Sequence, residues 1–205
     1  MSHRTPSESD TRQKLIMAGT EEFFRHGYQK ASLRRICAAC GLTTGAFYFL
    51  FSSKDELLCS IVDPVAEQCV AMTEQLFRQE LADPSSGPDN DRQLAEFQYR
   101  HRREFLIILE GCDGSSRQDL KEQFLSRLEE YFSYFFTAAL DQKPDPELIK
   151  LLVSLRYQGI SQILKGNYSL KQTLYLNSVL SQYADGGTQT LIRYINQMSE
   201  KQPYR

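Results

Sequence analysis

Three helix-start signals fall within residues 32–56, and they constrain the fold more than any other feature of the chain. Ser32 and Thr43 each precede a short run of helix-forming residues, where a hydroxyl can accept a hydrogen bond from the first helical turn. Ser53, with Glu56 three residues later, has the spacing of a capping box. Gly41 lies between the first two signals and favours a turn. This stretch therefore predicts two short helices joined by a turn, and then the start of a longer helix.

The remainder of the chain shows helical spacing and clear breakers, with no strand pattern. Residues 10–26 are predicted to form one helix that stops at Gly27, residues 33–39 a short one, and Pro64 is expected to interrupt or kink the helix that follows Ser53. The effect of Gly186-Gly187 on the last helical region stays open. The predicted loops are 82–92, 111–116 and 141–146, and the predicted later helices are 93–110, 117–140, 146–165, 169–184 and 188–200.

Composition indicates an ordinary globular protein. The 205 residues are 41% hydrophobic and 24% charged, which is enough to form one large domain or two unequal ones. The apolar run "FYFLF" is far shorter than the roughly 20 residues of a transmembrane helix, and the polar N-terminal sequence contains no apolar signal region. Five scattered cysteines fit reduced thiols better than a disulfide framework. We therefore expect a cytoplasmic location.

Charge is distributed unevenly along the chain. The overall net charge is -2, but residues 1–56 carry 8 basic and 6 acidic side chains, whereas residues 57–205 carry 16 and 20. The N-terminal part is therefore net +2 and the remainder net -4. This asymmetry has the sign expected for an N-terminal module that meets phosphate groups.

Two short helices around Gly41 match the helix-turn-helix layout, whose second helix enters the major groove of DNA. Thr44 offers a hydroxyl, Ala46 offers a methyl group to thymine, and Gly45 permits close approach of the backbone. Phe47 and Phe51 are four residues apart and are predicted to face inward. The side chains predicted to contact phosphates are Thr43, Tyr48 and Lys54.

At these residues the sequence resembles a known family. The segments "FFRHGY" and "SLRRICAACGLTTGAFYFLFSSKDELL" resemble the DNA-binding domain of the TetR family of bacterial regulators, over about Arg12 to Leu58. Three departures stand out: Leu50 replaces a phosphate-reaching residue, Arg35 replaces an acid near a helix start and gains a possible phosphate contact, and Gly19 replaces a usual alanine at a cost of about 1 kcal/mol of helix propensity. The resemblance implies DNA contacts at Arg34, Thr43, Thr44, Gly45, Ala46, Tyr48 and Lys54.

The resemblance also implies an architecture and a function. It implies an all-α fold with a tail (1–8), a three-helix DNA-binding domain (9–56), and a larger helical domain for effector binding and dimerisation (57–205). The implied function is a ligand-responsive regulator. We expect a repressor that binds a palindromic operator in double-stranded DNA as a homodimer and is released by an unidentified small molecule, although activation is an alternative. No cofactor is implied.

Two sets of residues in the larger domain are candidates for these roles. Aromatic helix segments at 104–111 and 129–140 are either plain core or the lining of an apolar pocket. The pocket candidates are Phe105, Glu110, Tyr131, Tyr134 and Tyr157. The candidates for the dimer interface recur at spacings of three and four, and could equally be intramolecular core; they are Leu152, Leu155, Gly159 and Ile163.

Other readings of the sequence are weaker. Cys37 and Cys40 have C-x-x-C spacing, but no second such pair exists and packing explains them better than a metal or redox site. Cys112 is the better candidate for a redox sensor because it lies beside a glycine-rich turn. No motif of an enzyme is present. A helical protein-interaction adaptor that kept the regulator fold is the main alternative function.

Overall fold

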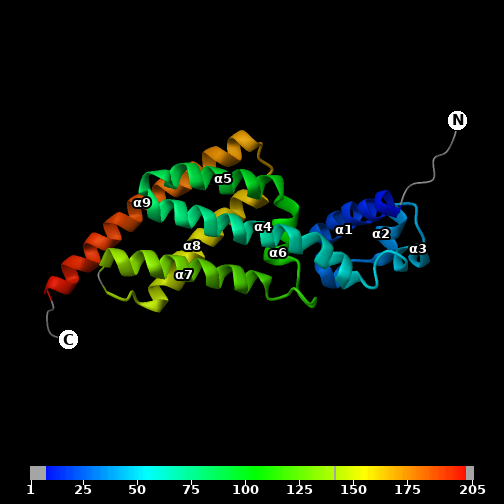
Figure 1. Cartoon of the computed structure of the whole chain (residues 1–205), viewed down its shortest axis with the longest axis horizontal. Coiled ribbons are helices and arrows are strands. Elements are labelled where there is room, and N and C mark those ends of the chain that lie inside the picture. Colours follow the sequence, from blue (N-terminus) through cyan, green and yellow to red (C-terminus); the bar gives the residue numbers. More distant parts are fainter. Residues whose placement is uncertain (1–7, 141, 202–205) are drawn as a thin grey trace. The chain divides into compact units, whose positions relative to one another are not determined.

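A computed structural model of the protein describes residues 8–140 and 142–201, and all regular structure in these ranges is helical (Figure 1). The predicted all-α fold is therefore confirmed. No helix of the described residues is long and apolar enough to span a bilayer. The elements are α1 (Glu8–Lys30), α2 (Leu33–Ala39), α3 (Thr44–Tyr48), α4 (Lys54–Ala82), the 3-10 helix η1 (Pro84–Ser86), α5 (Gly87–Arg100), α6 (Arg102–Glu110), α7 (Leu120–Leu140), α8 (Pro146–Lys165) and α9 (Leu170–Lys201).

The described residues form two compact units. The head unit comprises residues 8–71 and 101–121, and the body unit comprises residues 72–100 and 122–201. Helix α4 begins in the head unit and ends in the body unit. The limits of the two units are set by how the residues pack. The functional boundary that the sequence predicts at residue 56 stays a prediction. Of the predicted tail, only Glu8 lies within the described residues, where it starts α1.

The head unit is built on a core of large side chains. Helix α1 packs against α2 and α6, and α2 packs against α3. The most buried members of this core share relative exposures of 1% or less; they are Leu15, Phe23, Ile36, Phe47, Phe51, Leu57, Leu58, Val62 and Ile107. Burying this much apolar surface holds short helices that would be marginal alone.

The body unit consists of longer helices. Helix α5 lies along α9, and α8 also packs on α9. One core cluster joins α7 to α8 through Phe136, Leu140, Ile149 and Val153. Leu191, Ile192 and Ile195 of α9 pack against this cluster, so this part of α9 belongs to the fold of the unit.

The predicted helix starts in the head unit are confirmed. The Ser32 hydroxyl accepts a hydrogen bond from the amide of Arg35, and Ser53 accepts one from Glu56 at 3.0 Å. The Glu56 carboxylate reaches back to the amide of Ser52 rather than to that of Ser53. Gly27 leaves the helical conformation as predicted, with a φ of 66°, a left-handed angle that glycine adopts without strain.

Two predictions about the longer helices were wrong. The predicted loop at 82–92 contains η1 and the start of α5, because proline, serine and aspartate in "DPSSGPD" serve as helix-start residues as well as loop residues. Asn90, buried in α5, donates to the carbonyl of Leu76 at 3.0 Å. The predicted helix 93–110 is two helices separated at His101, whose φ and ψ of -107° and 30° are not helical.

Helices α9 and α4 are both continuous at residues that often break a helix. Residues 170–201 form one helix through Gly186-Gly187, whose effect the sequence left open. Helix α4 likewise continues past Pro64, so the proline does not interrupt it. Pro64 is exposed and Gly186 has no neighbour near the position of a Cβ atom, which shows that neither residue is placed there by close packing.

Candidate nucleic-acid interface

The turn between α2 and α3 is fixed by local hydrogen bonds. Gly41 has a φ of 68°, and the amide of Leu42 donates to the carbonyl of Cys37 at 2.9 Å. The hydroxyl of Thr43 accepts from the amide of Ala46 at 3.1 Å, which caps α3. Two short helices joined by this turn have the helix-turn-helix geometry that the sequence predicts.

Helix α3 has one buried and one exposed face. Phe47 is fully buried and stacks on Phe51, with ring centroids 5.6 Å apart, so the predicted inward orientation of both residues is confirmed. Thr44 and Gly45 are exposed, Ala46 is half-buried and Tyr48 is 57% exposed. The face of α3 that the sequence assigns to DNA is therefore accessible.

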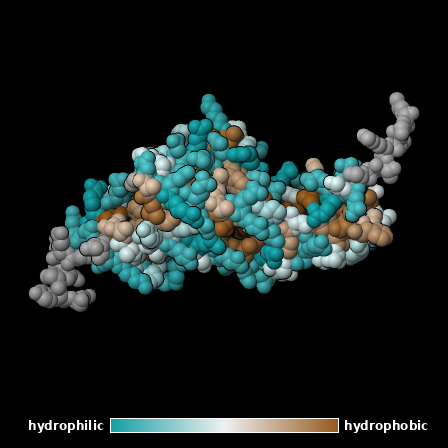
Figure 2. Space-filling view, in the orientation of Figure 1, coloured by the Kyte–Doolittle hydropathy of each residue, from teal (hydrophilic) through white to brown (hydrophobic). Residues whose placement is uncertain are grey.

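Phe49 is a feature of this face that sequence reasoning missed. Its side chain is 90% exposed, the highest value among the exposed large hydrophobic residues described. Figure 2 shows hydrophobic surface gathered at the α1–α3 end of the chain. The spacing of Phe47 and Phe51 predicts which residues of "FYFLF" face inward, but it does not say how far Phe49, the residue that ends α3, is exposed.

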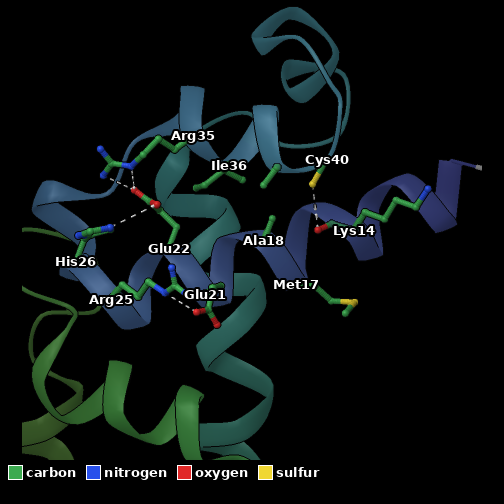
Figure 3. Close-up of a pocket in the computed structure, with 11 residues that line it drawn as sticks. Lys14, Met17, Ala18, Glu21, Glu22, Arg25, His26, Arg35, Ile36 and Cys40 are labelled. Atoms are coloured by element: carbon green, nitrogen blue, oxygen red, sulfur yellow. Dashed lines mark hydrogen bonds and ion pairs between the residues drawn. The ribbon is translucent and has the colours of Figure 1, made fainter.

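Glu22 connects α1 to the start of α2 (Figure 3). One of its oxygens accepts from the backbone amide of Ser32 and from Nε of Arg35, each at 2.8 Å. Burial opposes ionisation of Glu22, but the hydrogen bonds from Arg35 and Ser32 outweigh it and lower its pKa. Arg35 also donates to the carbonyl of Lys30 at 3.0 Å. The guanidinium proposed from sequence as a possible phosphate contact is thus engaged within the protein.

A hollow of about 720 Å³ lies between α1 and α2 beside this connection (Figure 3). Cys40 lines it and donates its thiol hydrogen to the carbonyl of Lys14 at 3.3 Å. Burial raises the pKa of both Cys37 and Cys40, which keeps them as thiols at neutral pH. These observations agree with the packing interpretation of the C-x-x-C sequence.

Lys54 is half-buried, and its ammonium group is directed at backbone carbonyls of the head unit. Its Nζ donates to the carbonyl of Tyr28 at 2.7 Å and to that of Ala31 at 3.2 Å. The same Nζ lies 4.3 Å from the centre of the Tyr28 ring. Burial lowers the pKa of Lys54, and the charge of Glu22 opposes this shift. The structure therefore gives Lys54 protein partners at the end of α1.

A loop after α6 is bound to the first turns of α4. Asp55 accepts from the amide of Ser116 at 2.9 Å and from its hydroxyl at 2.6 Å. Asp63, two turns further along α4, accepts two hydrogen bonds of 2.7 Å from Arg117. Burial opposes ionisation of Asp55, but the bonds from Ser116 lower its pKa overall. Sequence reasoning missed these contacts, because no local pattern pairs residues about 55 to 60 positions apart.

The predicted pocket residues do not lie in one unit. Phe105 is buried in α6 and Glu110 is exposed at its end, both in the head unit. The others lie in the body unit, where Tyr131 packs on Phe77 with ring centroids 4.6 Å apart, Tyr134 is exposed and Tyr157 is buried. Neither unit alone brings this set together.

The predicted dimer residues have different surroundings. Leu155 is 61% exposed, whereas Leu152 packs against the core cluster of the body unit. A Cβ atom on Gly159 would lie 2.7 Å from Leu180, so this glycine permits close packing of α8 on α9 within the chain. Ile163 is half-buried. Sequence reasoning missed other exposed apolar side chains of these helices, among them Leu151, Tyr175, Val179 and Tyr183.

Cys112 does not have the surroundings of a reactive thiol. It is buried, and burial together with the nearby charge of Asp113 raises its pKa to about 12. A thiolate is the reactive form of cysteine, and this environment disfavours it. Within the described ranges, no group of three or more potential ligand side chains is placed to hold a metal ion.

The capped turn, the buried Phe47 and the exposed opposite face of α3 define a helix-turn-helix DNA-binding protein. Residues 15–61 match the family model described as "Bacterial regulatory proteins, tetR family". Over these residues the chain is similar to the DNA-binding domain of the TetR family, and the relatives and solved structures that it resembles are described as transcriptional regulators.

Known proteins resemble the chain over different lengths. YerO of Bacillus subtilis (strain 168), an uncharacterized HTH-type transcriptional regulator, is 22% identical over 138 residues. This alignment covers 65% of the chain and 43% of YerO, so the chain spans less than half the length of this curated relative.

Solved structures resemble a larger part of the chain. A regulator of the TerR/AcrR family from Aquifex aeolicus VF5 is 21% identical with a TM-score of 0.57, covering 84% of this chain and 99% of that one. NalD of Pseudomonas aeruginosa, the secondary repressor of the MexAB-OprM multidrug efflux pump, is 20% identical with a TM-score of 0.54. That likeness covers 85% of this chain and 95% of NalD. Both likenesses show the fold.

Proposed function

We propose that the protein is a transcriptional repressor that binds a palindromic DNA operator as a homodimer and is released by a small molecule. The exposed face of α3 carries this proposal. Thr44, Gly45 and Ala46 lie at the helix start, where a recognition helix meets base edges, and Tyr48 follows one turn later. Cytoplasmic location follows from this DNA-binding role.

The remaining DNA contacts are assigned to the edge of this face. Thr43 is exposed beside α3, and its hydroxyl can donate to a phosphate while its oxygen caps the helix. Arg34 is exposed in the first turn of α2 and provides a guanidinium for a backbone phosphate. Lys54 completes the set that the family resemblance implies, and its role is treated separately below.

The exposed side chains of α8 and α9 support the homodimer. Leu151 and Leu155 lie one turn apart on α8, and Tyr175, Val179 and Tyr183 recur every four residues on α9. Large apolar side chains gathered on neighbouring helices are typical of an interface between subunits. A two-fold dimer presents two copies of α3, which matches the symmetry of a palindromic operator.

Release by a small molecule is the part of the proposal that rests on relatives. NalD is named as a repressor connected with a multidrug efflux pump, and the fold of this chain resembles it. In the proposed mechanism, a ligand of the body unit shifts the population of conformers toward one whose two copies of α3 do not fit the operator. Helix α4 carries the change, because it runs without a break from Lys54 to Ala82. The pocket candidates are those named from the sequence.

The first test is selection of bound sequences from a random pool of duplex DNA. Wild-type protein is compared with Tyr48→Ala and with Met17→Ala, a control at a side chain that is 66% exposed on α1 of the same unit. We expect an enriched palindrome for the wild type and the control. The Tyr48 variant should bind it at least about tenfold more weakly, the effect of losing one good contact.

The outcome also decides between the proposal and its alternative. A folded wild-type dimer that enriches no sequence would contradict the operator-binding role and favour a protein-interaction adaptor. If a palindrome is found, the same duplex becomes the probe for a screen of small molecules. A compound that releases the duplex supports the proposed small-molecule effector. A compound that increases binding to the duplex would instead be a co-repressor, which contradicts release by a ligand.

A further inference from the structure

The end of α1 is a place where the backbone needs partners. Helix α1 breaks at Gly27, and the four residues that follow lead directly to Ser32, the cap of α2. The last carbonyl groups of a helix have no amide donor within the helix, and they carry partial negative charge. The position of the segment 28–31 therefore determines where the helix-turn-helix lies relative to α1.

Lys54 donates to two of these carbonyl groups, and the Tyr28 carbonyl also accepts from the amide of Ala31 at 3.3 Å. Its Nζ bonds to the carbonyls of Tyr28 and Ala31, at 2.7 and 3.2 Å. It also lies over the Tyr28 ring at 4.3 Å, a distance that allows a cation–π interaction. Lys54 is half-buried and its pKa is lowered, first by burial. Two of its three N–H donors are therefore directed into the protein.

Other hydrogen bonds hold the same segment. The Tyr28 amide donates to the carbonyl of Gly111 at 2.7 Å. Glu22 accepts from the amide of Ser32, and Arg35 donates to the carbonyl of Lys30. Lys54 is the member of this set that comes from α4, so it joins the start of α4 to the connection between α1 and α2.

We propose that Lys54 is a positioning residue, which holds the helix-turn-helix in its DNA-binding arrangement through the carbonyl groups of Tyr28 and Ala31, and is not a phosphate contact. This inference rests on the proposed DNA-binding function, and it differs from the role that the family resemblance implies for Lys54. Arg34, which is exposed on α2, supplies the comparison, because it is assigned to a phosphate.

Salt dependence distinguishes the two roles. Each phosphate contact releases counterions, so a protein that loses one such contact shows a smaller slope of log K against log [salt], by about 0.9. A positioning residue changes affinity without changing the number of phosphates neutralised. Global destabilisation alone changes neither quantity, provided that affinity is measured per folded molecule at a temperature well below unfolding.

The experiment uses the full chain and the selected operator duplex. Affinity is measured over a series of salt concentrations for the wild type, Lys54→Met, Arg34→Met and Tyr28→Leu, with the active fraction determined by titration at high DNA concentration. Tyr28→Leu removes the ring below Lys54 and leaves its charge in place. It provides a second measurement if Lys54→Met does not fold.

We expect Lys54→Met to bind about tenfold more weakly at every salt concentration, since it loses charge-assisted hydrogen bonds, with the wild-type slope retained. Tyr28→Leu should show a smaller loss and the same slope. Arg34→Met should lower the slope by about 0.9.

Four results would overturn the inference. A slope for Lys54→Met reduced as in Arg34→Met would make Lys54 a phosphate contact, and unchanged affinity would remove its positioning role. Unchanged affinity of Tyr28→Leu, if only this variant folds, would have the same meaning. A wild-type protein that binds no duplex would overturn the proposed function and the inference together, so the wild-type curve separates that failure from failure of the inference alone.

Discussion

At the scale of single residues, Glu22 is the contact point between α1 and α2. One carboxylate serves the amide of Ser32 and the guanidinium of Arg35, and it is only 10% exposed. Hydrogen bonds from several donors stabilise the ionised form of the Glu22 carboxylate. The start of α2 is therefore held by a charge on α1 as well as by its own cap.

We predict that stability depends on the charge of Glu22. Its pKa is lower in the folded protein, because the bonds from Arg35 and Ser32 outweigh the effect of burial. A lowered carboxylate pKa contributes stability that is present above the unfolded pKa of 4.5 and is lost as pH falls through the folded pKa. Glu22→Gln should weaken the charged hydrogen bond to the Ser32 amide and lower the free energy of unfolding at pH 7 by about 1 kcal/mol. Urea unfolding of both proteins at pH 7 and at pH 3 tests this, since the difference should shrink at the lower pH; an equal difference at both values would contradict it.

Gly27 permits a second prediction at this scale. Its φ of 66° is strained for other residues, although a Cβ atom there would lie 3.7 Å from the nearest atom, the Gly111 carbonyl oxygen, without a clash. Gly27→Ala should therefore destabilise the protein by about 1–2 kcal/mol through backbone strain alone. Thermal unfolding at fixed protein concentration measures the change. An unchanged midpoint would show that the left-handed conformation is not required.

At the scale of elements, local signals predicted more than distant ones. The starts of α2, α3 and α4 depend on Ser32, Thr43 and Ser53, which act within three residues of themselves, and all three were predicted. The start of α5 was missed because "DPSSGPD" suits a loop and a helix start equally. Which surface of α3 is exposed followed from the positions of Phe47 and Phe51.

The candidate site was predictable only in part, for the same physical reason. The residues that present α3 follow one another in the sequence. Those that hold it in place do not: Lys54 binds residues 23 and 26 positions earlier, and Asp55 binds Ser116. Such pairs form only when tertiary packing brings the helices together, so neither hydrophobic periodicity nor a capping residue in the sequence predicts them.

Helix α9 gives the prediction that belongs to this scale. It is continuous through Gly186-Gly187, where glycine is disfavoured by its backbone freedom. A Cβ atom at Gly186 would meet nothing within 4 Å. Gly186→Ala should therefore stabilise the helix by up to about 1 kcal/mol. Gly159→Ala is the matched control with the opposite expected effect. Its Cβ atom would lie 2.7 Å from Leu180, so this substitution should destabilise the protein. Thermal unfolding of the two variants at one protein concentration decides; a loss of stability for Gly186→Ala would indicate that this position is covered by another surface.

At the scale of the whole molecule, the surface of α8 and α9 is the feature that a single chain leaves unexplained. Leu155 is 61% exposed and Tyr183 is 80% exposed, whereas the sequence-based choice of Leu152 and Gly159 fell on residues that pack within the chain. A spacing of three and four identifies an apolar helix face but does not say whether that face meets its own chain or a second copy.

We predict that this surface forms the homodimer. Placing a charge on each helix, in Leu155→Glu with Val179→Glu, should give a folded monomer, because two carboxylates would be buried without partners in the interface. Light scattering coupled to size-exclusion chromatography gives the mass, and circular dichroism checks the helical content. Tyr134→Glu is the control, since Tyr134 is 55% exposed on α7 and outside this surface, and it should remain dimeric.

The double variant should also lose operator affinity, because one recognition helix meets only one half-site. A wild-type monomer at micromolar concentration, or a double variant with the mass of a dimer, would place the interface elsewhere or remove it.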